Sequence, residues 1–204
     1  MNKLLAKPTM IRGLSFTQPY AWCMFHGKDV ENRGNASKNH RGPLAIVASM
    51  SATRKDWSEH VRAIGTIEPS LEAALPTFYR AIRGGLIGAV EVHGVAPPYE
   101  SGLRKWHFQG KYGLLCRNAT ELPFREMKGH QGLLRVQLTA FEAGLLERGR
   151  VLRVLTCKLC GERSYAHEWK VTKSTCQPPN HKAHIGVCPL CEGSWNAETM
   201  GLLY

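Results

Sequence analysis

Three charged side chains close together in the sequence have types suited to a binding or catalytic site: Lys28, Glu31 and Arg33. Glu31 and Arg33 are two positions apart, so in a strand their side chains leave the same face. A carboxylate can accept hydrogen bonds from the exocyclic amine of a base such as cytosine, and an arginine can hold a phosphate. A lysine held out of water beside another cation could act as a base or nucleophile. The segment therefore predicts a site for an anionic or nucleobase ligand.

Neighbouring side chains extend this predicted site. Tyr20 and Trp22 could stack on a base, and Arg41 offers a second phosphate-binding guanidinium. A simpler interpretation stays open, in which Glu31 only forms a salt bridge with Lys28 or Arg33. The predicted ligand-binding residues are Gln18, Tyr20, Trp22, Lys28, Glu31, Arg33 and Arg41.

Two Cys-x-x-Cys motifs near the C-terminus have the spacing of a metal site: Cys157 with Cys160, and Cys188 with Cys191. Two residues between the thiols let both sulfurs point at one ion, and two such pairs complete a tetrahedral zinc site. Four thiolates leave no open coordination position, so the Zn²⁺ is expected to be structural and to supply folding energy. The motifs predict a small zinc ribbon with four cysteine ligands.

The composition favours a nucleic-acid partner. The 204 residues carry a formal net charge of +11, and a basic excess of this size usually has an anionic partner. The simpler alternative is a solvated basic surface. No apolar run is as long as the roughly 20 residues of a spanning helix, so no membrane partner is expected. Cysteines in metal-binding motifs indicate a reducing compartment, and a cytoplasmic location is expected.

Periodicity and turn residues give the elements that must position these residues. Strands are expected over 11–16, 29–33, 43–49, 86–95, 111–117 and 132–138, and helices over 18–27, 54–64, 70–83 and 139–148. Thr53 and Thr139 are expected to cap two of these helices, and Pro76 to kink a third. Helices placed irregularly among strands favour an α+β fold with a mixed, curled sheet or small barrel.

Several motifs along this region carry a family resemblance. They are Leu14-Ser15-Phe16-Thr17-Gln18-Pro19-Tyr20-Ala21, Gly27-Lys28, Glu31-Asn32-Arg33, Arg41-Gly42-Pro43-Leu44, Ala48-Ser49, Leu86-Ile87-Gly88-Ala89-Val90, Tyr112-Gly113, Lys128-Gly129 and Gln131-Gly132-Leu133. Residues 11–138 resemble the ASCH domain of the PUA-like superfamily. The resemblance implies a PUA-like mixed β-barrel with flanking helices, and a cleft floored by the Gln18–Lys28 helix and the Lys28–Arg33 strand. Residues 139–150 are then a linker helix, and residues 151–204 the zinc ribbon.

The resemblance also implies functions. Such domains are thought to bind RNA or single nucleotides, and one group hydrolyses the acyl group of N4-acetylcytidine, while others have been described as ribonucleases. Lys28 and Arg33 match residues of the hydrolase group, whereas Glu31 stands where that group has a threonine. Glu91 is a candidate for the group's catalytic glutamate by strand face alone.

Three functions are therefore expected in turn. The first is recognition of RNA, favoured over DNA, or of a modified nucleobase. The second is hydrolysis with Lys28 and Glu31 as catalytic residues. The third is an interaction module in which the ribbon docks on a protein partner.

Overall fold

The computed structural model describes residues 9–34, 39–157, 160, 163–173, 184–187, 189, 191–192 and 194–196. The chain divides into two compact units, one spanning Thr9–Val151 and the other containing the described residues from Leu152 onward. The first unit holds the sheet and the charged segment. The second holds the cysteines of the Cys-x-x-Cys motifs.

The first unit is built on a mixed six-stranded sheet with the order β2-β5-β4-β3-β1-β6. Its strands are β1 (Thr9–Phe16), β2 (Val30–Arg33), β3 (Gly42–Ala48), β4 (Gly85–Ala96), β5 (Tyr112–Glu126) and β6 (Leu134–Leu138). β1 and β3 run parallel, and the other neighbours are antiparallel. The predicted α+β class and mixed sheet are confirmed.

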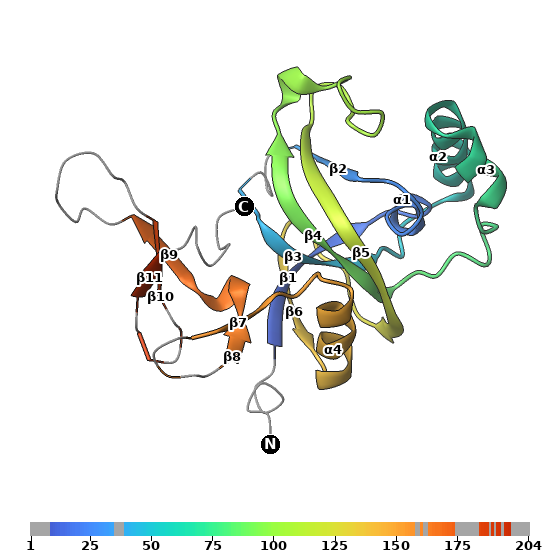
Figure 1. The fold of residues 1–204 in the computed structure, drawn as a ribbon. Helices are drawn as coiled ribbons and strands as arrows, with labels where there is room; N and C mark the ends of the chain where they lie inside the picture. The colour runs from blue at the N-terminus through green and yellow to red at the C-terminus, as the bar shows by residue number, and fades with distance from the viewer. Residues whose placement is uncertain are drawn as a thin grey trace. The chain divides into compact units, whose positions relative to one another are not determined.

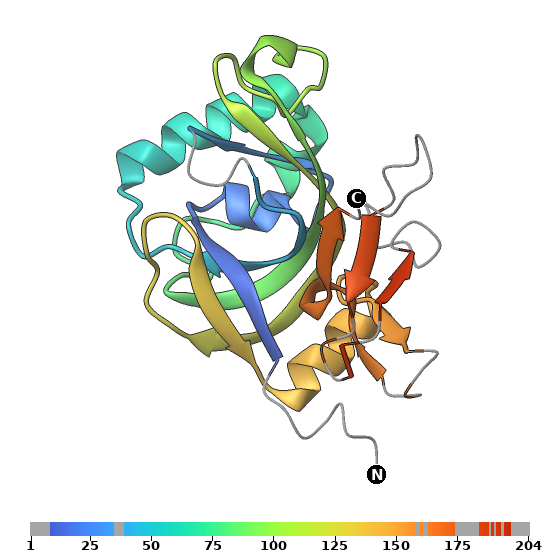
Figure 2. The same cartoon turned by 90° about the vertical axis from the view of Figure 1, so that its left-hand side faces the viewer.

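The sheet curls around the short helix α1 (Tyr20–Cys23), as Figures 1 and 2 show. All seven residues of β3 are buried, as expected for a continuous apolar strand in the middle of a sheet. Leu14 and Phe16 of β1, Met24 after α1 and Leu44 of β3 pack in one apolar core. In the strand order β2 and β6 lie at the two edges, so backbone pairing does not close the sheet in the described residues.

Among the described residues of this unit, three further α-helices accompany the sheet: α2 (Arg54–Ile67), α3 (Pro69–Ala74) and α4 (Ala140–Arg148). Figure 1 shows α2 and α3 together on one side, with α4 next to β6. The predicted caps are confirmed, because Thr53 and Thr139 each form a reciprocal capping box with the acidic residue three positions later. Such a box satisfies two orphaned backbone donors at the start of each helix.

Three predicted elements differ most in length from the structure. α1 ends at Cys23 instead of reaching residue 27, where Gly27 has a left-handed backbone with φ 108°. The helix predicted over 70–83 ends at Ala74, because a proline pushes the residue before it out of the helical region, and Leu75 has ψ 139°. β5 continues far beyond Arg117 as a partner of β4, with register shifts along the pair.

The second unit contains two small antiparallel sheets. β7 (Val154–Thr156) pairs with β8 (Arg163–Tyr165), and β10 (His184–Val187) lies between β9 (Lys170–Lys173) and β11 (Ser194–Asn196). Trp169 and Tyr165 are buried, and the Trp169 indole donates to the Ser164 hydroxyl at 2.9 Å.

Candidate functional site

Lys28 and Glu31 form a buried ion pair at the start of β2. Lys28 Nζ lies 2.6 Å from Glu31 Oε2, and the two residues are only 3% and 8% exposed. The turn at Gly27 brings the Lys28 backbone N–H to the Cys23 carbonyl at 2.9 Å, which points the Lys28 side chain back over α1. The ammonium also donates to the Met24 sulfur at 3.4 Å, so it contacts an apolar side chain as well as the carboxylate.

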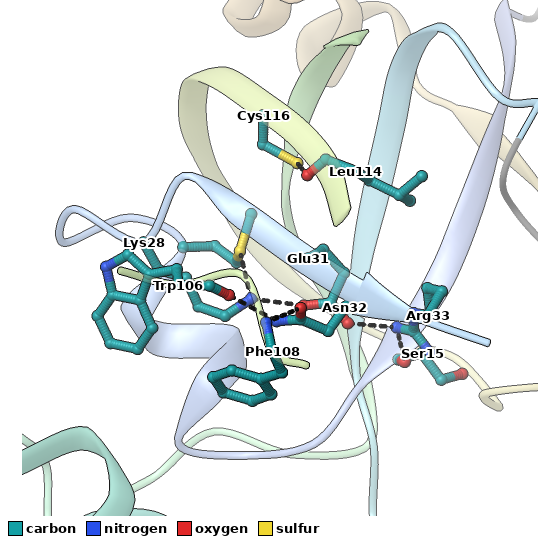
Figure 3. Close-up of polar contacts among 10 residues, drawn as sticks. Ser15, Lys28, Glu31, Asn32, Arg33, Trp106, Phe108, Leu114 and Cys116 are labelled. Carbon is teal, nitrogen blue, oxygen red and sulfur yellow. Dashed lines mark hydrogen bonds and ion pairs between the residues drawn. The ribbon is translucent and has the colours of Figure 1, made fainter. Parts of the chain in front are cut away.

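Arg33 continues this row of charges toward β1 (Figure 3). Its Nη2 lies 2.9 Å from Glu31 Oε1 and donates to the Ser15 carbonyl at 2.8 Å. The guanidinium also lies 5.3 Å from the centre of the Phe16 ring. Glu31 thus has one oxygen on each of two cations, and the salt bridge expected under the simpler interpretation is present in both of its forms.

Asn32, between Glu31 and Arg33 on β2, holds a distant segment in place. Its Nδ2 donates to the Trp106 carbonyl at 2.7 Å, and its Oδ1 accepts from the Phe108 backbone N–H at 2.7 Å. Trp106 is fully buried. The two bonds place the Phe108 ring beside the Lys28–Glu31 pair, as Figure 3 shows.

A cavity of about 400 Å³ opens at this row of charges. Its aromatic wall consists of Tyr20, His60 and Phe108, with ring centres 4.8 Å apart for Tyr20 and His60 and 6.1 Å apart for Tyr20 and Phe108. Burial raises the pKa of Tyr20, and Cys23 and Glu31 raise it further, so the phenol stays protonated and can donate a hydrogen bond. The cavity can therefore take a flat, polar ring.

Among the described residues, the charged side chains lining the cavity are three cations and one carboxylate: Lys28, Arg33 and Lys111 with Glu31. Glu31 is already shared between two of these cations. The excess positive charge favours a ligand that carries negative charge.

Four of the predicted ligand-binding residues line this cavity, namely Tyr20, Lys28, Glu31 and Arg33, and three lie elsewhere. Gln18 is 2% exposed, and its amide bonds the Ile82 carbonyl and the Trp22 N–H, so it holds α1 in place. Trp22 stacks on His26 with ring centres 3.5 Å apart. Arg41 donates to the His40 carbonyl.

Glu91 also lies away from the cavity. Its carboxylate accepts from Arg117 Nε at 2.7 Å and Nη2 at 2.9 Å, and from the Asn118 amide at 2.8 Å. Glu91 is 1% exposed and is fully used in joining β4 to β5. The prediction for Glu91 rested on its strand face alone. That is a weak signal in β4, because the register shifts along the β4–β5 pair change which side chains share a face.

Seven residues of the cavity lining were not predicted from the sequence. They are Ser15, Thr17, Asn32, Gly34, His60, Phe108 and Lys111. Asn32 and Thr17 stand within the motifs that predicted the site and could have been found there. His60 on α2 and Phe108 before β5 are brought in by tertiary packing, which no local pattern indicates.

In the second unit, Cys157, Cys160 and Cys191 lie together and could hold a metal ion. Their sulfur atoms are within 4.8 Å of one another, and the Cys157 and Cys191 sulfurs are 3.7 Å apart. Cys157 is buried, whereas the other two are exposed. The predicted fourth ligand, Cys188, lies outside the described residues.

No known protein-family model matches the chain, and no curated protein matches it. Among the described residues, none of the helices has the length and apolar character needed to cross a membrane.

His40 should make the stability of the protein depend on pH. Burial lowers its pKa from 6.5 to about 4, and Arg12 and Arg41 add to the shift against the hydrogen bond to the Pro43 carbonyl. As the pH falls, His40 is therefore protonated in the unfolded chain before it is protonated in the folded protein. The stability that neutral His40 contributes is present above about pH 6.5 and is lost toward about pH 4.

In a His40→Gln variant, the loss of unfolding free energy between about pH 7 and 4.5 should shrink by about 2 kcal/mol. Urea unfolding at several pH values, monitored by tryptophan fluorescence, measures this difference in unfolding free energy. An unchanged pH dependence in the variant would contradict the assignment.

Proposed function

We propose that residues 11–138 form a PUA-like barrel of the ASCH type that binds RNA or a modified nucleobase in the cavity at Lys28. The curled mixed sheet supports the barrel. Two arginines also bond across its open side: Arg33 of β2 donates to the Ser15 carbonyl of β1, and Arg125 of β5 donates to the Gln137 carbonyl of β6. Side chains thus make connections that backbone pairing makes in a closed barrel.

The observation that carries the binding function is the combination of an aromatic wall with a buried row of charges in one cavity. Its volume of about 400 Å³ falls within the range of roughly 300–1,000 Å³ that small-ligand sites occupy. Tyr20 and Phe108 offer ring faces for stacking, which contributes roughly 1–3 kcal/mol per base. The phenol of Tyr20 and the ammonium of Lys28 offer donors to base carbonyls, and Lys111 and Arg33 suit a phosphate.

The metal in the second unit is proposed to be a structural Zn²⁺ held by Cys157, Cys160, Cys188 and Cys191. Zinc–thiolate bonds of about 2.3 Å in a tetrahedron place the sulfurs about 3.8 Å apart. The 3.7 Å between the Cys157 and Cys191 sulfurs matches that separation. Bound zinc would supply folding energy to the unit. Cysteines that bind a metal ion rather than form disulfides are typical of a reducing compartment such as the cytoplasm.

Binding of labelled single-stranded RNA and DNA, with and without N4-acetylcytidine, tests the proposal. Fluorescence anisotropy should show binding that weakens steeply with salt, because phosphate contacts release counterions. Tyr20→Ala should weaken RNA binding about tenfold or more through lost stacking. The matched control is Tyr99→Ala, since Tyr99 is 86% exposed and does not line the cavity. An absence of binding to all of these nucleic acids at low salt would contradict the proposal.

The alternative function, hydrolysis of an N-acylated base, is favoured by one specific observation. Thr17 lines the same cavity as the buried Lys28–Glu31 pair, so a hydroxyl, an amine and a carboxylate share one site. Water would add to the amide carbon of N4-acetylcytidine, and the C–N bond would break to give acetate and cytidine. Turnover should then be lost in Thr17→Val and kept in Tyr99→Ala. Chromatography measures the release of acetate. Binding of N4-acetylcytidine without this release would leave recognition as the function.

A further inference from the structure

A second and larger cavity, of about 820 Å³, adjoins the one at Lys28. The two cavities share Ser15, Thr17 and Arg33 as lining residues. Arg33 is held at this shared boundary by its bonds to Glu31 and to the Ser15 carbonyl. The smaller and larger cavities are therefore two compartments of one cleft with a guanidinium between them.

The far wall of the larger cavity is the segment 127–132 between β5 and β6, and hydrogen bonds attach it to β1. Ser15 Oγ donates to the His130 carbonyl at 3.0 Å and accepts from the His130 N–H at 2.9 Å. Gly129 permits this approach, because a Cβ there would lie 2.6 Å from Ser15 Oγ. The wall is thus positioned by specific contacts with Ser15, a residue that lines both cavities.

The larger cavity has the side chains that a nucleic-acid strand requires. Within the described part of the chain, Lys128 and Arg83 line it against one carboxylate, Glu126, and Arg33 adds a further cation at the shared boundary. Phe124 lines it as a half-exposed aromatic ring, at 50% exposure. Cations beside an exposed ring are the combination that holds single strands through phosphate contact and base stacking.

We propose that the cleft takes a single-stranded nucleic acid of at least two nucleotides rather than one isolated nucleotide. This inference rests on the proposed function. One base occupies the smaller cavity beside Tyr20, and the phosphate linking it to its neighbour lies at Arg33. The neighbouring nucleotide occupies the larger cavity, with Lys128 near its backbone and Phe124 as its stacking surface. The shared arginine makes the two compartments act on one continuous chain.

A length series measured on the full chain by competition anisotropy tests this inference. The competitors are a mononucleotide, a dinucleotide and a tetranucleotide of RNA, each as mixtures of all four bases. The dinucleotide should bind at least about tenfold more tightly than the mononucleotide, since a second stacked base and a phosphate contact are added. Equal affinities for the mononucleotide and the dinucleotide would overturn the inference while leaving the proposed function intact.

Two variants locate the added affinity. Lys128→Gln should weaken dinucleotide binding and lower its salt slope by about one, while mononucleotide binding stays unchanged. Gly129→Ala should act in the same direction by displacing the wall from Ser15, and Lys55→Gln, an exposed lysine outside both cavities, serves as control.

A Lys128→Gln variant that binds both lengths as the parent does, or that weakens both equally, would overturn the assignment of the second compartment. Failure of every length to bind would overturn the proposed function together with this inference. Because Lys128 is exposed, its replacement tests the site even if Gly129→Ala does not fold.

Discussion

Replacing Glu31 with alanine is expected to lower the free energy of unfolding by about 3–5 kcal/mol, because a buried cation would lose its carboxylate partner. Lys28 is 3% exposed and lies 2.6 Å from Glu31, and Arg33 depends on the same carboxylate. The double replacement Lys28→Met with Glu31→Leu should cost much less, since apolar groups of similar volume need no charge partner. Urea unfolding of the three proteins measures both differences.

The double variant also separates stability from binding. It should remain folded and yet weaken RNA binding, because Lys28 and Glu31, two of the four charged side chains lining the cavity, are gone. Glu121→Ala is a suitable control at an exposed carboxylate, where a change within about 0.5 kcal/mol is expected. If Glu31→Ala destabilises the protein no more than Glu121→Ala does, the ion pair is solvated and cannot orient a ligand.

The second large effect concerns the metal. The full chain should contain about one zinc, and a strong chelator or Cys157→Ser should remove it and unfold the second unit, since zinc binding to such sites supplies about 10–16 kcal/mol in apparent terms. Elemental analysis gives the stoichiometry, and limited proteolysis shows which unit opens. The first unit should stay resistant because it has its own apolar core.

Cys176→Ser is the matched control for this experiment, since Cys176 lies outside both Cys-x-x-Cys motifs. It should keep the zinc and the protease resistance of the parent. Less than about one zinc per chain in the untreated protein, or full zinc retention in Cys157→Ser, would contradict the four-cysteine site.

Local signals in the sequence were enough for most of the core elements. The caps at Thr53 and Thr139 and the apolar run of β3 have physical causes within a few residues, and the structure has them where they were expected. The second half of β5 has no such cause, because its residues 118–126 are mostly polar and become a strand by pairing with β4. Tertiary pairing decides such segments, so the sequence could not predict them.

The residues of the candidate site also fall into a group that the sequence could predict and a group that it could not. Lys28, Glu31 and Arg33 could be predicted because a turn and a short strand bring them together locally. His60 and Phe108 come from distant parts of the chain and needed the folded structure. Trp22 was expected in the site beside Tyr20, but it stacks on His26 and does not line the cavity.

The charges on β2 have a consequence for the behaviour of the protein in concentrated solution. β2 pairs only with β5 among the described strands and is an edge strand of four residues. Unpaired backbone groups on such an edge can recruit the edge of another molecule, and short length and charged side chains are what discourage this. The short length of β2 and the partly exposed Arg33 side chain therefore help to keep molecules apart. A variant that neutralises this strand should be handled at low protein concentration, with light scattering to detect self-association.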